Sequence, residues 1–247
     1  MVRALTQCIA AGVLALLGFW LPTILNAATV QARVTRFDTS GKRNNAPDRG
    51  AVLWLTPILK SVEQPDRIPH EVAGTRFRLV QKNKRFHPHV LVVPVGSQVE
   101  FPNRDPFFHN VFSLFDGKRF DLGLYEAGTT RMVNFDRPGI CYIFCNIHSE
   151  MSAVVIVLAT PYYGISNSEG EISIPSVPAG RYQLHVWNER SSPEVLNNLV
   201  REITISGDPC SLGIIRLPES GKLVQTHKNK YGRDYDPATA NPIYNHK

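Results

Sequence analysis

Residues 139–151 read GICYIFCNIHSEM and hold the pattern that decides the fold. From Cys141 to Cys145, every second residue would share one face of an extended strand. The apolar and aromatic residues predict a strand, and the polar residues that follow predict a tight loop between two strands. We expect the odd-numbered side chains to face a core and the even-numbered ones, including Phe144, to project outward.

From Thr29 onward, short strands of this kind are predicted along most of the chain, with no persuasive helical period. The expected strands are residues 29–37, 51–55, 76–80, 90–93, 98–101, 110–114, 131–135, 140–145 and 153–159. Many short strands separated by turn residues are typical of an all-β sandwich or barrel.

The strand pattern restarts on a smaller scale near Thr160 and Pro161. Four further strands are expected, at residues 171–174, 182–187, 199–205 and 212–217. After Pro218 the chain becomes polar and basic, which predicts an extended or mobile tail until it docks. The expected units are therefore a first β-domain at residues 28–159, a smaller β-sandwich at residues 160–218 and a tail at residues 219–247.

The N-terminal segment predicts export. Arg3 supplies a positive charge, residues 9–25 are almost entirely apolar, and Ala27 offers a small residue at a cleavage site. A retained membrane anchor is the alternative, because the apolar stretch approaches spanning length. Pro22 and the small residues after it favour cleavage. We expect a signal peptide at residues 1–27, a periplasmic destination and no stable membrane span afterwards.

The net charge indicates which partners the protein could bind, and the number of cysteines indicates a free thiol. The net charge of +6 suits an acidic partner or an anionic membrane surface. Nucleic acid is not expected, because no Lys/Arg run interleaved with aromatic residues is present. Beyond the leader the chain has Cys141, Cys145 and Cys210, an odd number, so at least one thiol stays outside an intramolecular disulfide. Metal ligation is one natural role for such a thiol.

Four side chains form a candidate donor set. Cys145, His148 and Met151 lie in one loop, and His109 opens an upstream strand. Two imidazoles, one thiolate and one weak thioether are the set that blue copper prefers. Zinc would take four strong ligands, and a Cys-His nucleophile pair would leave Met151 unexplained.

These residues resemble those of the cupredoxins, in particular members with a short Cys-x2-His-x2-Met loop. The chain looks closer still to exported cupredoxin-domain proteins often labelled "methylamine utilisation protein". The matching text is FHPHV (86–90), VGS (95–97), FPN (101–103), HNVFS (109–113) and CNIH (145–148). The resemblance covers most of residues 29–159. It implies a Greek-key sandwich, one type 1 copper and electron transfer without bond chemistry, hence no enzyme.

The resemblance also implies roles for particular residues. His109, Cys145 and His148 would be equatorial copper ligands and Met151 the axial one. Asn110 would brace the two ligand loops by hydrogen bonding.

An electron carrier should also expose an apolar patch around a ligand imidazole. Pro106, Phe107, Phe108 and Ile147 could supply this patch near His148, as the surface for a redox protein partner.

One departure concerns a second thiol. The binuclear copper centre of terminal oxidases uses Cys-x3-Cys-x3-His, whereas only two residues separate Cys145 from His148. In a strand, moreover, Cys141 and Cys145 would lie more than about 12 Å apart. We therefore expect one copper and a core position for Cys141.

The remaining histidines give weaker signals. His87 and His89 flank Pro88 and could form an entry-site copper pair, although we expect them to be solvated. His70, His185 and His227 are weaker candidates still, and Trp187 is expected in the core.

The second unit contains SEGEISI (168–174) and VPAGRYQL (177–184), which resemble carboxypeptidase regulatory-like domains. Such domains are small transthyretin-like β-sandwiches without catalytic residues of their own. A scaffold, a docking surface and a carbohydrate-binding module all remain open for this unit.

The function expected first is an exported blue-copper electron carrier. The alternative is a copper-binding protein for storage, delivery or sensing. A storage protein would more often carry Met and His clusters, and this chain has only 3 Met.

Overall fold

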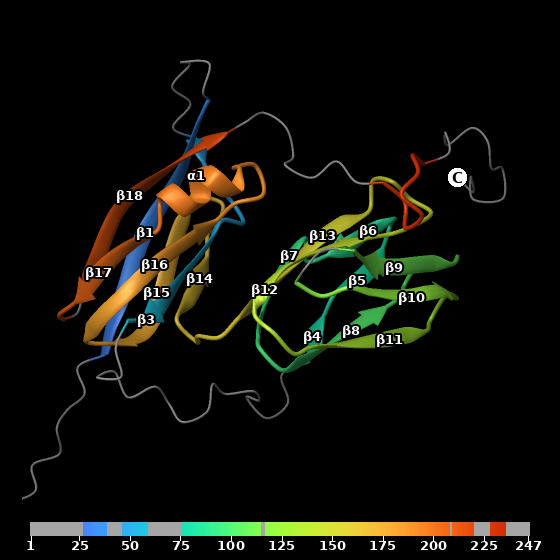
Figure 1. Cartoon of the computed structure of the whole chain (residues 1–247), viewed down its shortest axis with the longest axis horizontal. Coiled ribbons are helices and arrows are strands. Elements are labelled where there is room, and N and C mark those ends of the chain that lie inside the picture. The colour runs from blue at the N-terminus through green and yellow to red at the C-terminus, as the bar shows by residue number, and fades with distance from the viewer. Residues whose placement is uncertain are drawn as a thin grey trace, which may run out of the picture.

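The computed structural model describes residues 27–38, 46–58, 76–114, 117–207, 209–219 and 228–235. The expected leader, apart from Ala27, lies outside these residues, as do His70 and His227. The described chain is all-β except for one short helix, which confirms the predicted fold class. Two β-sandwiches lie next to each other (Figure 1).

The first sandwich, here called the loop sandwich, spans residues 77–158 and carries the 145–151 loop. Its larger sheet has the order β10 (Phe120–Tyr125), β9 (His109–Ser113), β12 (Gly139–Phe144), β13 (Ser152–Leu158) and β7 (Val90–Pro94). Its smaller sheet has the order β11 (Thr130–Phe135), β8 (Ser97–Pro102) and β4 (Phe77–Arg78). A separate hairpin joins β5 (Val80–Lys82) to β6 (Arg85–His87).

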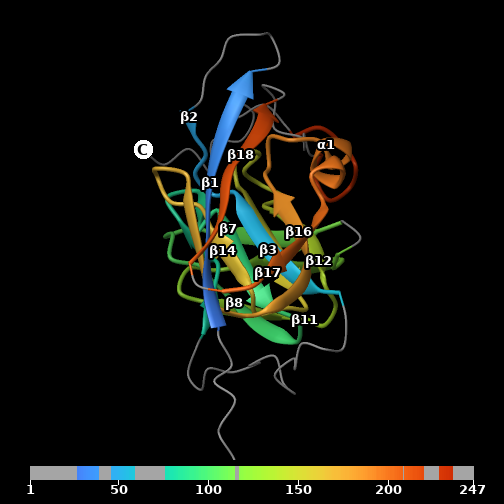
Figure 2. The same cartoon turned by 90° about the vertical axis from the view of Figure 1, so that its left-hand side faces the viewer.

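The second sandwich, here called the companion sandwich, combines strands from both ends of the chain. One sheet has the order β15 (Glu171–Pro178), β1 (Ala27–Asp38) and β18 (Cys210–Glu219), with β2 (Ala46–Pro47) also paired to β1. The other has the order β14 (Tyr163–Ile165), β3 (Val52–Pro57), β16 (Gly180–Trp187) and β17 (Arg201–Ile205). Figure 2 shows this sandwich facing the viewer, with β1 running along its length.

The one helix of the described chain, α1 (Pro193–Asn198), belongs to the companion sandwich. Ser192 caps its N-terminus by accepting a hydrogen bond from the Val195 N–H. Within the described residues no helix is long and apolar enough to cross a membrane.

The pairing of β1 and β3 differs from the expected division of the chain at residues 28 and 159. Both strands were expected in the first domain, but Val30 pairs with Ile174 of β15, and Leu53 pairs with Val186 of β16. The loop sandwich is thus inserted between β3 and β14 of the companion sandwich. Alternation along a strand indicates which face is buried but not which partner strand supplies the hydrogen bonds, so the sequence pattern missed this connection.

The two sandwiches share a buried apolar interface formed by the outer face of β13. Ala153, Val155 and Val157 point into the core of the loop sandwich. The alternate residues, among them Ile156, pack in a second cluster with Trp187 of β16. Both faces of β13 are therefore buried, which explains why the strand is almost continuously apolar.

The interface predicts a matched pair of stability effects. Ile156→Ala should lower the free energy of unfolding by about 2–5 kcal/mol, because it leaves a cavity in a fully buried cluster. Ile214→Ala, at a side chain that is 59% exposed in β18, should change it by less than about 0.5 kcal/mol. Urea denaturation of both variants measures the difference, and equal effects would contradict the buried interface.

Candidate metal centre

Strand pairing brings the two ligand-bearing segments together. His109 opens β9, Cys145 follows β12, and β12 pairs with β9 through Phe144 and Phe112. The loop after β12 closes on itself. The Cys145 N–H donates to the Met151 carbonyl (3.2 Å), and the Met151 N–H donates to the His148 carbonyl (3.0 Å).

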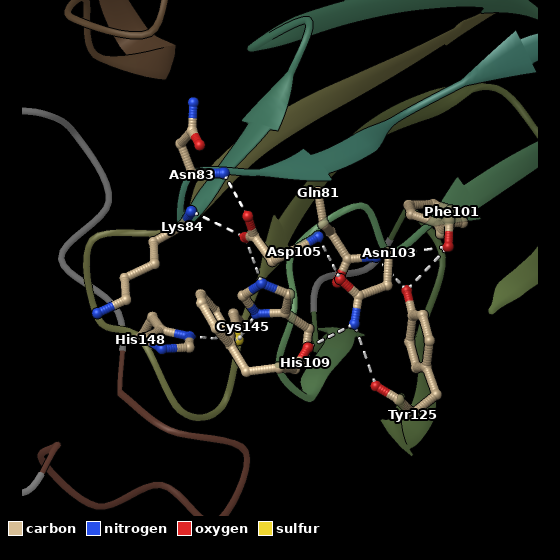
Figure 3. Close-up of polar contacts among 11 residues, drawn as sticks. Gln81, Asn83, Lys84, Phe101, Asn103, Asp105, His109, Tyr125, Cys145 and His148 are labelled. Carbon is tan, nitrogen blue, oxygen red and sulfur yellow. Dashed lines mark hydrogen bonds and ion pairs between the residues drawn. The ribbon is translucent and has the colours of Figure 1, made fainter. Parts of the chain in front are cut away.

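Three of the four predicted donors meet in one place (Figure 3). The Cys145 Sγ lies 3.7 Å from the His109 Nδ1 and 3.7 Å from the His148 Nδ1. The potential ligand atoms of these residues all lie within 4.8 Å of one another, and no other such His/Cys/Asp/Glu group occurs in the described chain. The contact between His109 and Cys145 was predicted, although 36 positions separate them.

These separations fit a bound metal ion. An ion about 2.0 Å from an imidazole nitrogen and about 2.3 Å from a thiolate sulfur, with an angle of about 120°, holds the two atoms roughly 3.7 Å apart. Both measured nitrogen-to-sulfur distances agree with this value. Soft sulfur together with imidazole is a donor set suited to copper.

Met151, the fourth predicted donor, is fully buried in the core cluster that also holds Cys145. Its backbone closes the loop through both of the hydrogen bonds described above. The thioether is therefore enclosed at the end of the loop, on the side of the loop-sandwich core.

A carboxylate that the sequence analysis missed orients His109. The Asp105 Oδ2 lies 2.8 Å from the His109 Nε2, which leaves the Nδ1 directed at Cys145. Asp105 also accepts the N–H groups of Asn83 (2.6 Å) and Lys84 (3.0 Å). Burial opposes the charged form, but these hydrogen bonds, with that of His109, still lower the pKa of Asp105. The sequence feature that could have predicted this contact is the position of Asp105 four residues before His109.

Asn103 stabilises the turn that carries Asp105. In the sequence, this residue was noted only as part of the FPN match to the cupredoxins. Its Oδ1 accepts the Asp105 N–H (3.0 Å), and its Nδ2 donates to the carbonyls of Phe107 (2.8 Å) and Tyr125 (3.3 Å). The side chain is fully buried. The Asn103 side chain thus supplies hydrogen bonds to backbone groups in the segment leading to His109.

Burial keeps the donor side chains uncharged. It lowers the pKa of His148 to about 4, with further lowering from His109 and Lys84. Burial also lowers the pKa of His109, although Asp105 opposes this effect. It raises the pKa of the Cys145 thiol, against N–H donors that include Asn110. At neutral pH both imidazoles are available as ligands and the thiol carries its proton.

Asn110 joins the two ligand-bearing segments by a hydrogen bond, as expected, and the bond comes from its backbone. Its backbone N–H donates to the Cys145 sulfur, which joins the segment after His109 to the loop after β12. Its side-chain Nδ2 donates instead to the Asp121 Oδ1 (2.6 Å) in β10.

Aromatic residues cover the histidines. The Phe107 ring centroid lies 5.2 Å from that of His109 and 5.7 Å from that of His148. Phe108 is 46% exposed, and Ile147 packs partly against the core. The Lys84 Nζ lies 5.7 Å from the centroid of Phe107, so a positive charge borders this apolar surface.

The expectation that Phe144 projects outward is wrong. Its side chain is buried, with its ring centroid 5.9 Å from that of Phe112 in β9. β12 is a central strand of its sheet, and both of its faces are covered. The odd-numbered residues face the core as expected.

The other candidates lie apart from this group. Cys141 is a buried core thiol, as predicted, and burial raises its pKa to about 11. The His89 Nε2 lies 2.6 Å from the Glu189 Oε2, and His87 is exposed. His185 stacks on Trp54, with ring centroids 5.1 Å apart.

Comparison with known proteins finds similarity in solved structures alone, since no protein family and no curated protein matches the chain. A copper-containing nitrite reductase from Thermus scotoductus is 23% identical, with a TM-score of 0.33, over 42% of this chain and 27% of that one. A reduced Cu(I) form of an amicyanin mutant is 22% identical, with a TM-score of 0.33, over 36% of this chain and 87% of that one. A purple cupredoxin from Nitrosopumilus maritimus is 25% identical, with a TM-score of 0.28, over 37% and 93%.

The protonation states predict a proton balance. Loading metal-free protein with Cu(I) at pH 7 should release about one proton per copper, because the thiol loses its proton while each neutral imidazole binds through its unprotonated nitrogen. Cys145→Ser should release almost none. A pH-stat titration measures both, and release of no proton by the unmodified protein would contradict ligation by Cys145.

Proposed function

We propose that this chain is a type 1 copper protein that transfers single electrons through one mononuclear site. His109, Cys145 and His148 would bind the metal directly, and Met151 would be the weak axial donor. The observation that carries the proposal is the enclosed group of two imidazole nitrogens and one sulfur at metal-compatible separations. Bound copper would accept and release one electron.

The surroundings support an electron-transfer role over storage. The donors are held by Asp105, by the Asn110 backbone and by the closed 145–151 loop, so little rearrangement is needed when charge changes. Copper storage would more often use several clusters, and the described residues contain one such group. We infer that the chain carries electrons without bond chemistry of its own.

The partner would be another redox protein that meets the apolar surface beside His148. Phe107 and Phe108 would form the contact, and Lys84 next to Phe107 suits an acidic rim on the partner. Export to the periplasm through residues 1–27 belongs to the same proposal.

The thiolate supplies the clearest test. Copper-loaded protein should show an intense visible absorption from thiolate-to-copper charge transfer. Cys145→Ser should remove that absorption almost completely, because a hydroxyl cannot supply the transition. The far-UV circular dichroism, which reports the fold, should stay unchanged. Cys141→Ser is the matched control and should keep the colour, since Cys141 lies outside the donor group. If the Cys145 variant kept the colour, Cys145 would not be a ligand.

The axial position is tested by electrochemistry. Met151→Leu should keep the colour but raise the reduction potential, because loss of a weak donor disfavours Cu(II). A rise of at least about 59 mV, a tenfold change in the one-electron equilibrium, is expected. Met132→Leu, at an exposed methionine, is the control. An unchanged potential would mean that Met151 only packs in the core.

A further inference from the structure

Part of the basic tail lies against the 145–151 loop. Residues 228–235 follow the companion sandwich in the chain but pack on the loop sandwich, as the red segment of Figure 1 shows. A turn gives this segment its own shape, because the Asn229 Oδ1 accepts the N–H groups of Tyr231 (3.0 Å) and Arg233 (3.1 Å).

Two hydrogen bonds connect the segment directly to the loop. The Tyr235 hydroxyl donates to the Cys145 carbonyl (2.8 Å), and the Lys230 N–H donates to the Asn146 Oδ1 (2.9 Å). The Cys145 N–H is already bonded to Met151, so both peptide groups of the thiol-bearing residue are fixed. The bond to the Cys145 carbonyl comes from Tyr235, which lies 90 positions away in the sequence.

A third contact reaches β10, the strand paired with the segment that carries His109. The Lys230 Nζ lies 2.7 Å from the Asp121 Oδ2, and the Asp121 Oδ1 accepts the Asn110 Nδ2 (2.6 Å). The tail segment is therefore linked to the loop after β12 and, through Asp121, to the residue that follows His109.

We propose that residues 228–235 form a strap that positions the metal-binding loop, with Tyr235 as the positioning residue for Cys145. The strap rests on the proposed function, because the geometry that it fixes is that of the sulfur donor. With the Cys145 carbonyl held by Tyr235, rotation of the peptide between Cys145 and Asn146 is restricted, and Lys230 restricts the Asn146 side chain. Loss of the Tyr235 bond frees this peptide without removing any metal ligand.

The test compares two single-hydroxyl deletions in the full-length chain. Tyr235→Phe removes the bond to Cys145. Tyr182→Phe removes a matched bond in the companion sandwich, where the hydroxyl donates to the Pro178 carbonyl at 2.8 Å. In metal-free protein, Tyr235→Phe should speed amide hydrogen exchange at Cys145 and Met151 about 2- to 10-fold, and Tyr182→Phe should leave these amides unchanged. In copper-loaded protein, only Tyr235→Phe should alter the thiolate charge-transfer band.

The possible results separate the strap from the copper proposal. Equal loop exchange in the two variants would overturn the strap. Faster exchange with identical visible spectra would overturn the positioning of the sulfur, because the segment would then only stabilise the loop. If the unmodified protein acquires no colour with copper, the proposed function fails, and the metal-free exchange measurement still decides whether residues 228–235 hold the loop.

Discussion

The antiparallel pairing of β12 with β13 runs from Gly139 opposite Val157 to Phe144 opposite Ser152. This register places the loop between the two strands at one end of the sheet, and it sets which side chains enter the core. Because side chains alternate along each strand, the same register directs Cys141 and Val155 into the loop sandwich and Ile156 into the interface with the companion sandwich. A shift of one residue would exchange the two faces and would turn the sulfur of Cys145 away from His109.

Burial has opposite consequences for the ligands and for their surroundings. The pKa of His148 falls to about 4 and that of the Cys145 thiol rises, so the metal-free centre is a group of neutral donors. The charge nearest to them is held outside the donor set, on Asp105, where backbone N–H groups stabilise it. This arrangement avoids an uncompensated charge in the buried centre while it keeps the His109 ring in one orientation.

The sequence was informative where the determining contacts are local. Cys145, His148 and Met151 lie in one loop, so their spacing predicted a donor group, and the start of a strand at His109 completed it. The approach of His109 to Cys145 was predicted from the donor set, but other contacts between distant segments were not predictable from spacing. These include the pairing of β1 with β15 and β18, and the hydrogen bond from Tyr235 to Cys145.

Other features depended on the complete sheet. Phe144 was expected outside because alternation describes a single strand, whereas its burial depends on neighbouring side chains such as Phe112 in β9. Asp105 and Asn103 act through hydrogen bonds within a turn, and a turn gives little periodic signal.

The insertion of the loop sandwich between β3 and β14 has a consequence for synthesis. Val30 of β1 pairs with Cys210 of β18, so this sheet stays incomplete until the ribosome has made most of the chain. All the strands of the loop sandwich emerge earlier and lie close together in sequence. Non-local pairing is slow because closing a long loop costs entropy before the distant contacts form, and domains generally fold as units as they emerge. The inserted sandwich can therefore fold before the later partner strands of β1 and β3 have been synthesised. Once it is compact, the two ends of the inserted segment are close together, which shortens the distance between β3 and β14.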